Sequence, residues 1–176
     1  MKHAGILLAL WLLFAPPVSA GSLSEAETLA LHEDIAEMVA AFEAGDATLL
    51  IERTHGSLPA LMGGREVFEQ VTEGAMRQLR EGGVRFVHFE QGEPTTTYPA
   101  GEEEVCFVPK SSVIDVQGKR VKSTSFMIAI RKMGGGRWTY LDGAGMRSNP
   151  ELLHQLLPKL ERGIAMPPNL VEPLAE

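Results

Sequence analysis

Apolar residues in the first half of the chain recur every three or four positions, which is the spacing of one face of an α-helix. The pattern predicts a first helix that starts at the capping box Ser24–Glu27 and ends at Gly45. A second, shorter helix is expected from Asp46 to about Thr54, and a third from about Arg65 to Glu81. The buried face of the third helix is expected to contain Val67, Phe68, Val71, Ala75 and Leu79.

The second half of the chain changes to the two-residue alternation of β-strands. In the segment Val84–Gln91 the alternation puts Val84, Phe86, His88 and Glu90 on one side. Two longer strands meet at Gln117-Gly118, a two-residue turn that would pair Val116 with Lys119. A four-residue loop, Met133–Gly136, leads to a last strand that ends at Asp142.

This register divides the hairpin into two faces, because residues opposite each other in a pair of strands point to the same side. One face contains Val105, Phe107, Pro109, Val113, Phe126, Ile128, Ile130, Thr139 and Leu141. The other contains Cys106, Val108, Lys110, Ser123, Ser125, Met127, Ala129, Trp138, Tyr140 and Asp142. Neither face is polar enough to be left in water. Helices can cover only one of them, so the other needs a C-terminal element or a partner subunit.

A C-terminal amphipathic helix is expected over residues 148–162, with Asn149 as its cap and Pro150 at its first position. Its leucines recur at helical spacing, and Pro158 predicts a kink or two short pieces. Residues 163–176 contain several prolines and are expected to form a flexible tail.

The N-terminus has the layout of a cleavable secretory signal over residues 1–20. Its apolar run, Ala4–Ala15, is shorter than the roughly 20 residues that a membrane-spanning helix needs. We therefore expect an exported protein, periplasmic or secreted, with no membrane span after cleavage. The net charge of −7 and the absence of a basic cluster argue against nucleic acid as a partner. The lone Cys106 lies among apolar residues and is expected to be structural.

These patterns predict an α+β fold in which three N-terminal helices pack on a curved antiparallel sheet, followed by a short C-terminal helix. Three motifs, Phe42–Asp46, Gly64–Val67 and Gly136–Tyr140, make residues 21–147 resemble the nuclear transport factor 2-like superfamily, which includes SnoaL-like cyclases and ketosteroid isomerases. The resemblance implies a cystatin-like cone, with a pocket between sheet and helices. It also implies a homodimer through the uncovered sheet face.

Members of that superfamily that act as isomerases or cyclases use a carboxylate inside the cone. Here the loop between His55 and Arg65 contains no acid, so Asp142, at the end of the last strand, is the best candidate for a general base. His88 or Tyr140 would assist it. The alternative is that Asp142 caps the turn that follows it and that His88 and Glu90 decorate an exposed strand.

The leading functional hypothesis is binding of an apolar or amphipathic small molecule or of a protein partner, without proven catalysis. The pocket is expected to be lined by Met38, Phe42, Val108, Met127, Trp138 and Tyr140. The first alternative is a small hydrolase or isomerase that uses Asp142, and the second is a protein-interaction module whose cone is filled. No cofactor is expected, and the spacing of His and Cys predicts no metal site.

Overall fold

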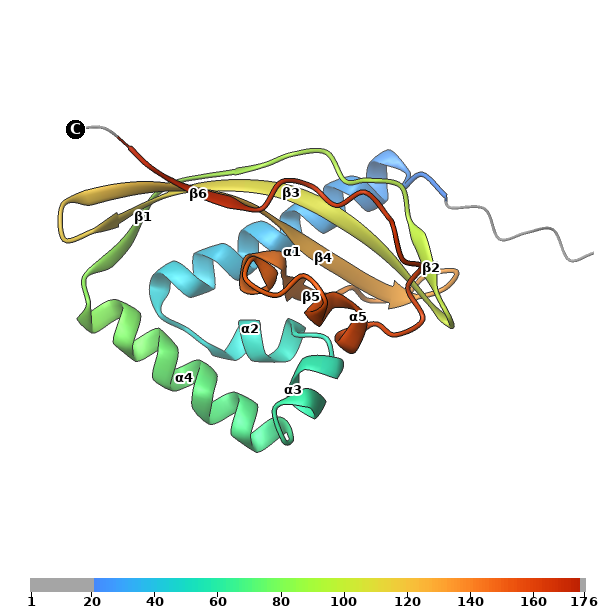
Figure 1. Ribbon diagram of the computed structural model, residues 1–176, viewed down its shortest axis with the longest axis horizontal. Helices are drawn as coiled ribbons and strands as arrows, with labels where there is room; N and C mark the ends of the chain where they lie inside the picture. Colours follow the sequence, from blue (N-terminus) through green and yellow to red (C-terminus); the bar gives the residue numbers. More distant parts are fainter. Residues whose placement is uncertain (1–20, 175–176) are drawn as a thin grey trace, which may run out of the picture.

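The N-terminal half of the chain folds into four helices, not three (Figure 1). In the computed structural model, which describes residues 21–174, these are α1 (Glu25–Ala44), α2 (Thr48–Arg53), α3 (Ser57–Leu61) and α4 (Arg65–Glu81). The bounds of α4 are those expected. Helix α3 has a single turn, too short to carry an apolar stripe, and its proline and the glycines on either side of it are typical of a loop. The expected signal, residues 1–20, lies outside the described residues.

Helix α1 has the predicted ends. The Ser24 hydroxyl accepts from the Glu27 amide at 3.3 Å, and the Glu27 carboxylate accepts from the Ser24 amide at 2.9 Å, so the capping box is confirmed. Gly45 ends the helix with φ 74°, a left-handed conformation that glycine adopts without strain. Helix α2 begins later than expected, at Thr48, whose amide donates to the Asp46 side chain at 2.9 Å.

Helix α4 buries a narrower face than its sequence predicts. Phe68 and Met76 are buried, whereas Val67, Val71, Ala75 and Leu79 are exposed. The expected stripe was therefore largely wrong. The helix packs at the border of the molecule, beside α3 and β1, so that only one edge of its apolar stripe meets the rest of the protein (Figure 1).

The strands form one antiparallel sheet with the order β1-β3-β4-β5. Strand β2 pairs with β3, and β6 pairs with β4 beyond the end of β5. The bounds are β1 Val84–Gln91, β2 Tyr98–Ala100, β3 Glu103–Val116, β4 Lys119–Lys132, β5 Thr139–Asp142 and β6 Leu170–Pro173.

The register of the central hairpin is as predicted. Val116 pairs with Lys119 across a two-residue turn, in which Gln117 has φ 54° and Gly118 has φ 86°. Positive φ at both positions is the geometry of the turn that matches the twist of a hairpin. Ile130 pairs with Thr139, which also confirms the predicted register of β5.

Strand β1 departs from simple alternation at a β-bulge. Phe86 lies opposite Ile114 and His88 lies opposite Val113, so that two steps along β1 match one step along β3. From His88 onward each side chain therefore lies on the face opposite to the one predicted. Phe89 joins the helix-facing side of the sheet, and His88 moves to the other side.

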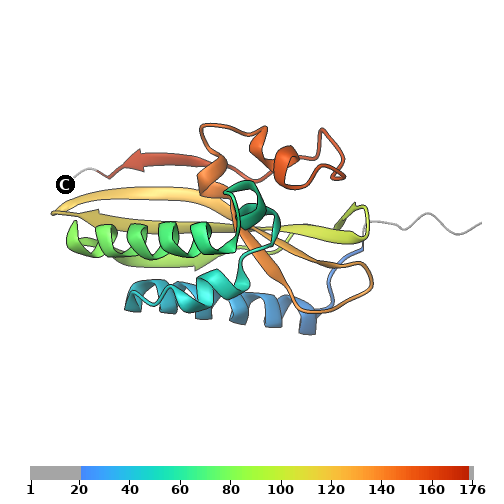
Figure 2. The same cartoon turned by 90° about the horizontal axis from the view of Figure 1, so that it is seen from below.

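The sheet lies between α1 and α2 on one side and the C-terminal segment on the other (Figure 2). Helix α1 covers the face that carries Cys106 and Tyr140. The buried cluster on this side comprises Leu31, Ile35, Met38, Cys106, Val108, Met127, Ala129, Trp138 and Tyr140.

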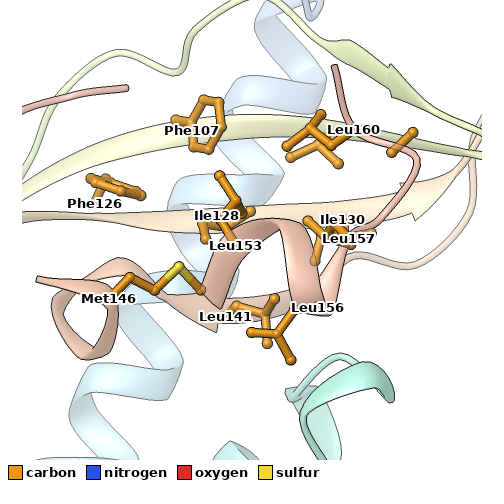
Figure 3. Packing of buried hydrophobic residues seen from close by; sticks show 12 residues of the cluster. Phe107, Phe126, Ile128, Ile130, Leu141, Met146, Leu153, Leu156, Leu157 and Leu160 are labelled. Atoms are coloured by element: carbon orange, nitrogen blue, oxygen red, sulfur yellow. The ribbon is translucent and has the colours of Figure 1, made fainter. Parts of the chain in front are cut away.

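The opposite face is covered by the C-terminal segment, which contains the 3₁₀ helix η1 (Gly143–Met146) and helix α5 (Leu152–Leu156) (Figure 3). The cluster comprises Ala100, Val105, Phe107, Phe126, Ile128, Ile130, Leu141, Met146, Leu153, Leu156, Leu157 and Leu160. This part of the sheet face is occupied by the protein's own chain. The expected homodimer stays a prediction.

Two details of the C-terminal segment differ from expectation. Helix α5 is only five residues long within the expected range 148–162, and Glu151, not Asn149, precedes its first residue. Residues 163–176, expected to be a flexible tail, contain strand β6, which pairs with Val121–Thr124 of β4. No helix within residues 21–174 is long and apolar enough to cross a membrane.

A buried arginine fastens α1 to the sheet. Arg131 of β4 is paired with Glu27 at 2.8 Å and with Glu104 at 2.7 Å, and its guanidinium lies 4.2 Å from the centre of the Trp138 ring. Hydrogen bonds from the Ser24 amide and hydroxyl, together with Arg131, lower the pKa of Glu27 to about 2. Glu27, a member of the capping box of α1, thus also attaches this helix to Arg131 of β4.

This anchor predicts an acid-dependent loss of stability. Because folding lowers the pKa of Glu27 from 4.5 to about 2, its stabilising effect is complete above pH 4.5 and is lost as the pH falls towards 2. The Glu27→Gln variant should melt at a lower temperature than the wild type at pH 7, and the two should converge near pH 2. Thermal unfolding followed by circular dichroism across this range tests it. Glu25→Gln, which removes another first-turn acid, is the control. A difference independent of pH would contradict the assignment.

Candidate functional site

A cavity of about 130 Å³ lies between α1 and the helix-facing side of the sheet. Its walls are apolar except at one end. The lining residues are Ile35, Met38, Val39, Phe42, Leu50, Phe86, Phe89, Lys110, Ser112, Met127 and Asp142.

The helical wall follows from the spacing of α1, since Ile35, Met38 and Phe42 fall on one side of a helix. The wall from β1 depends on the bulge. Phe86 and Phe89 are three residues apart, so they would point to opposite faces of a regular strand. The extra residue between Phe86 and His88 brings both rings to the cavity.

The polar end of the cavity is an ion pair. The Lys110 ammonium lies 2.9 Å from Oδ2 of Asp142. The lysine side chain is only 17% exposed, whereas that of Asp142 is 53% exposed. A nearly buried cation therefore faces the cavity with a counter-ion that is open to solvent.

Asp142 has a structural role as well. Its Oδ1 accepts from the Ala144 amide at 2.9 Å and caps η1, while Oδ2 pairs with Lys110. Both oxygens of the proposed general base are thus engaged, as the turn-capping alternative predicts.

Two phenylalanines separate this cavity from a second one. The rings of Phe42 and Phe86 meet edge to face, with centroids 5.1 Å apart. Both rings also line a cavity of about 270 Å³ that reaches Met76 and Leu79 of α4. The Phe42–Phe86 pair is therefore the wall between the two spaces.

The predicted ligand-binding residues are divided between the cavity and the core. Met38, Phe42 and Met127 line the cavity. Val108, Trp138 and Tyr140 are 0%, 5% and 1% exposed and fill the core beneath α1 instead. A residue on the helix-facing side of the sheet can line the cavity or fill the core. Only the packing of α1 determines which of the two it does.

Tyr140 is part of a buried polar cluster. Its hydroxyl donates to Oδ2 of Asp34 at 2.9 Å, and Arg53 donates to the same oxygen at 2.9 Å. Burial, with the adjacent Asp34 carboxylate, raises the pKa of Tyr140 well above its usual value. Tyr140 is therefore a neutral donor that links β5 to α1, and it does not reach Asp142.

His88 lies on the other face of the sheet. It is half exposed and contacts Glu90 at 2.8 Å. Because of the bulge, it is on the side away from α1, whereas Asp142 lines the cavity under α1. The structure does not bring His88 and Asp142 together.

Lys110 is the site residue that the sequence analysis missed as a candidate. The sequence contained a signal for it: Lys110 is a cation on the predicted sheet face, and its neighbours there, Val108, Ser112 and Ser125, are all uncharged. A cation in such a position must be paired or serve a ligand.

Metal and thiol chemistry have no support among residues 21–174. These residues contain no group of three or more His, Cys, Asp or Glu that could hold a metal ion. Cys106 is fully buried, and burial raises the pKa of its thiol to about 12. The thiol is thus kept in its unreactive form.

The Tyr140–Asp34 bond predicts a measurable contribution to stability. Tyr140→Phe removes a hydrogen bond to a charged acceptor, which should lower the free energy of unfolding by about 1.5–3 kcal/mol. Urea denaturation measures the change. Tyr98→Phe is the matched control, because the Tyr98 hydroxyl has no hydrogen-bond partner among the described residues. Equal effects of the two substitutions would show that the bond contributes nothing.

Comparisons of the chain with protein family models, with curated proteins and with solved structures found no match. The resemblance to the nuclear transport factor 2-like superfamily therefore stays a prediction. What the structure establishes is an α+β fold with an open, six-stranded antiparallel sheet, and the function has to be argued from the site.

Proposed function

We propose that this chain binds a small amphipathic acid. The apolar body of the ligand would lie among the side chains of α1 and β1, and its carboxylate would meet Lys110. The observation that carries the proposal is a cation only 17% exposed at the end of an apolar cavity.

The size of the cavity limits the ligand. A cavity of 150 Å³ in another protein holds one benzene molecule, and pockets for drug-sized ligands occupy about 300–1,000 Å³. The space here is about 130 Å³. A single ring or a short alkyl chain fits, whereas a fused polycyclic substrate does not.

The ion pair supplies the specificity for an acid. A carboxylate that approaches Lys110 forms a charge-assisted hydrogen bond in a site with little water. Asp142 compensates the lysine charge when no ligand is present. Its Oδ2 can be hydrated when a ligand takes its place on Lys110, because the side chain is 53% exposed, while Oδ1 keeps its bond to the Ala144 amide. The carboxylate of the ligand thus replaces that of Asp142 as the partner of Lys110, and the apolar body of the ligand fills the cavity.

Binding has better support than proton transfer. Asp142 is held by Lys110 and the Ala144 amide, and neither His88 nor Tyr140 lines the cavity. On this proposal the fold is a cone of the nuclear transport factor 2-like type, exported through the signal at residues 1–20. Its order of helices and antiparallel strands is compatible with that cone.

The proposal predicts opposite effects of two substitutions. We expect benzoate to shift the NMR resonances of Met38 and Met127 methyl groups. Lys110→Met should weaken this binding about ten- to hundredfold, because it removes a charge-assisted hydrogen bond. Asp142→Asn should strengthen it several-fold, because the competing charge disappears while the cap oxygen remains. Benzyl alcohol, which lacks the charge, should bind both variants and the wild type alike.

Phe42→Ala tests the location. It removes the wall between the two cavities, so naphthoate should bind this variant and not the wild type. If benzoate binds with the same affinity to wild type and Lys110→Met, or shifts no cavity methyl, the proposal is wrong.

A further inference from the structure

A serine, a histidine and a glutamate form a hydrogen-bonded chain on a different part of the molecule. The Nδ1 atom of His55 lies 2.8 Å from the Ser57 hydroxyl, and its Nε2 atom lies 3.1 Å from Oε1 of Glu103. His55 and Ser57 come from the α2–α3 junction, and Glu103 begins β3. None of the three lines the cavity under α1.

The hydrogen bonds fix the tautomer of His55. The Ser57 amide, which can only donate, points at Nδ1 at 3.4 Å. The Glu103 carboxylate, which can only accept when ionised, faces Nε2. The proton of the neutral ring is therefore on Nε2, and the lone pair of Nδ1 faces the Ser57 hydroxyl. This is the arrangement of a nucleophile, a base and a group that orients the base.

The fold holds this chain in place. The His55 amide donates to the Tyr140 carbonyl at 3.0 Å, and Thr54 forms a bridge with Tyr140, so the α2–α3 junction is attached to β5. The His55 side chain is 14% exposed and Glu103 is 37% exposed. Ser57 is half-buried.

We propose that Ser57 is a nucleophile, with His55 as its general base and Glu103 as the positioning residue, and that small uncharged carboxylic esters acylate it. Glu103 also borders a neighbouring hollow of about 410 Å³, whose charged lining residues are Lys132, Lys159, Glu102 and Glu103 and whose lining does not include His55 or Ser57. Two positive and two negative side chains give this hollow no net charge, which favours a neutral substrate nearby.

The chemistry balances without a cofactor. Nδ1 of His55 takes the Ser57 proton as Oγ forms a bond to the ester carbonyl carbon. The bond from that carbon to the alcohol oxygen breaks, and the proton passes from Nδ1 to the departing alkoxide. Water then attacks the acyl group by the same route, which releases the acid and restores the serine. Glu103 stabilises the imidazolium that forms in each step.

A fluorophosphonate probe tests the nucleophile directly, because serine oxygen displaces fluoride from it and hydrogen fluoride leaves. The purified full chain should take up one label, and peptide mapping should place it on Ser57. Ser57→Ala should take up none, whereas Ser111→Ala, which removes a similarly half-buried serine, should label like the wild type. Labelling elsewhere, equal labelling of Ser57→Ala, or none in the wild type would overturn the proposal.

Three further variants separate the roles. His55→Gln should slow both labelling and the hydrolysis of p-nitrophenyl acetate about 10²–10⁴-fold, the usual contribution of a general base. Glu103→Leu should slow both reactions as well, because Nε2 of His55 loses the acceptor that orients the ring, and Glu103→Gln, whose amide oxygen can still accept from Nε2, should restore part of the rate. A merely structural glutamate would show no such rescue, and this result would remove Glu103 from the proposal.

A cysteine variant gives an independent measurement should Ser57→Ala fail to fold. In Ser57→Cys the new thiol should react with iodoacetamide much faster than Cys106, which is buried and serves as an internal standard. His55→Gln added to this variant should slow the alkylation. If it leaves the rate unchanged, His55 is not the base.

Discussion

The structure depends on one constraint: the part of the β3–β4 hairpin away from its turn is apolar on both faces, and both must be removed from water. Val105, Phe107 and Ile128 on one face, and Val108 and Ala129 on the other, are completely buried. Truncating a single buried aromatic side chain of this kind typically costs about 3–5 kcal/mol, a large part of the stability of a domain. The chain meets the constraint by wrapping the hairpin with its helices on one side and its C-terminal segment on the other.

Covering both faces also encloses charged side chains. The exposure of the carboxylate partner distinguishes a cation that joins elements of the fold from one that belongs to a binding site. Arg131 and Arg53 are 11% and 12% exposed, and each has a carboxylate partner that is itself shielded: Glu104 is 15% exposed and Asp34 is 24% exposed. Lys110 is 17% exposed, but its partner Asp142 is 53% exposed. The first two pairs join elements of the fold. The third faces a cavity with a partner that can be exchanged, which is why we place the ligand there.

Caps and turns could be predicted from the sequence, because they depend on neighbouring residues. The burial of side chains between packed elements could not. The capping box at Ser24, the glycine stop at Gly45 and the turn at Gln117-Gly118 each depend on a few neighbouring residues, and each was predicted correctly. The exposed side of α4 depends on where the helix docks, and the division of Met127 and Val108 between cavity and core depends on how α1 lies on the sheet. No pattern within one element contains that information.

The bulge in β1 shows how far a single residue can change a functional conclusion. A regular strand would have placed His88 on the face of the sheet that lines the cavity, as Asp142 does, and would have kept acid–base catalysis as a hypothesis. The extra residue sends His88 to the opposite face and gives its place to Phe89, so that an apolar ring closes the wall. A site with three phenylalanines and one paired lysine is suited to holding an acid, as proposed above, more than to moving a proton. The choice between binding and catalysis at this cavity therefore follows from the register of one short strand.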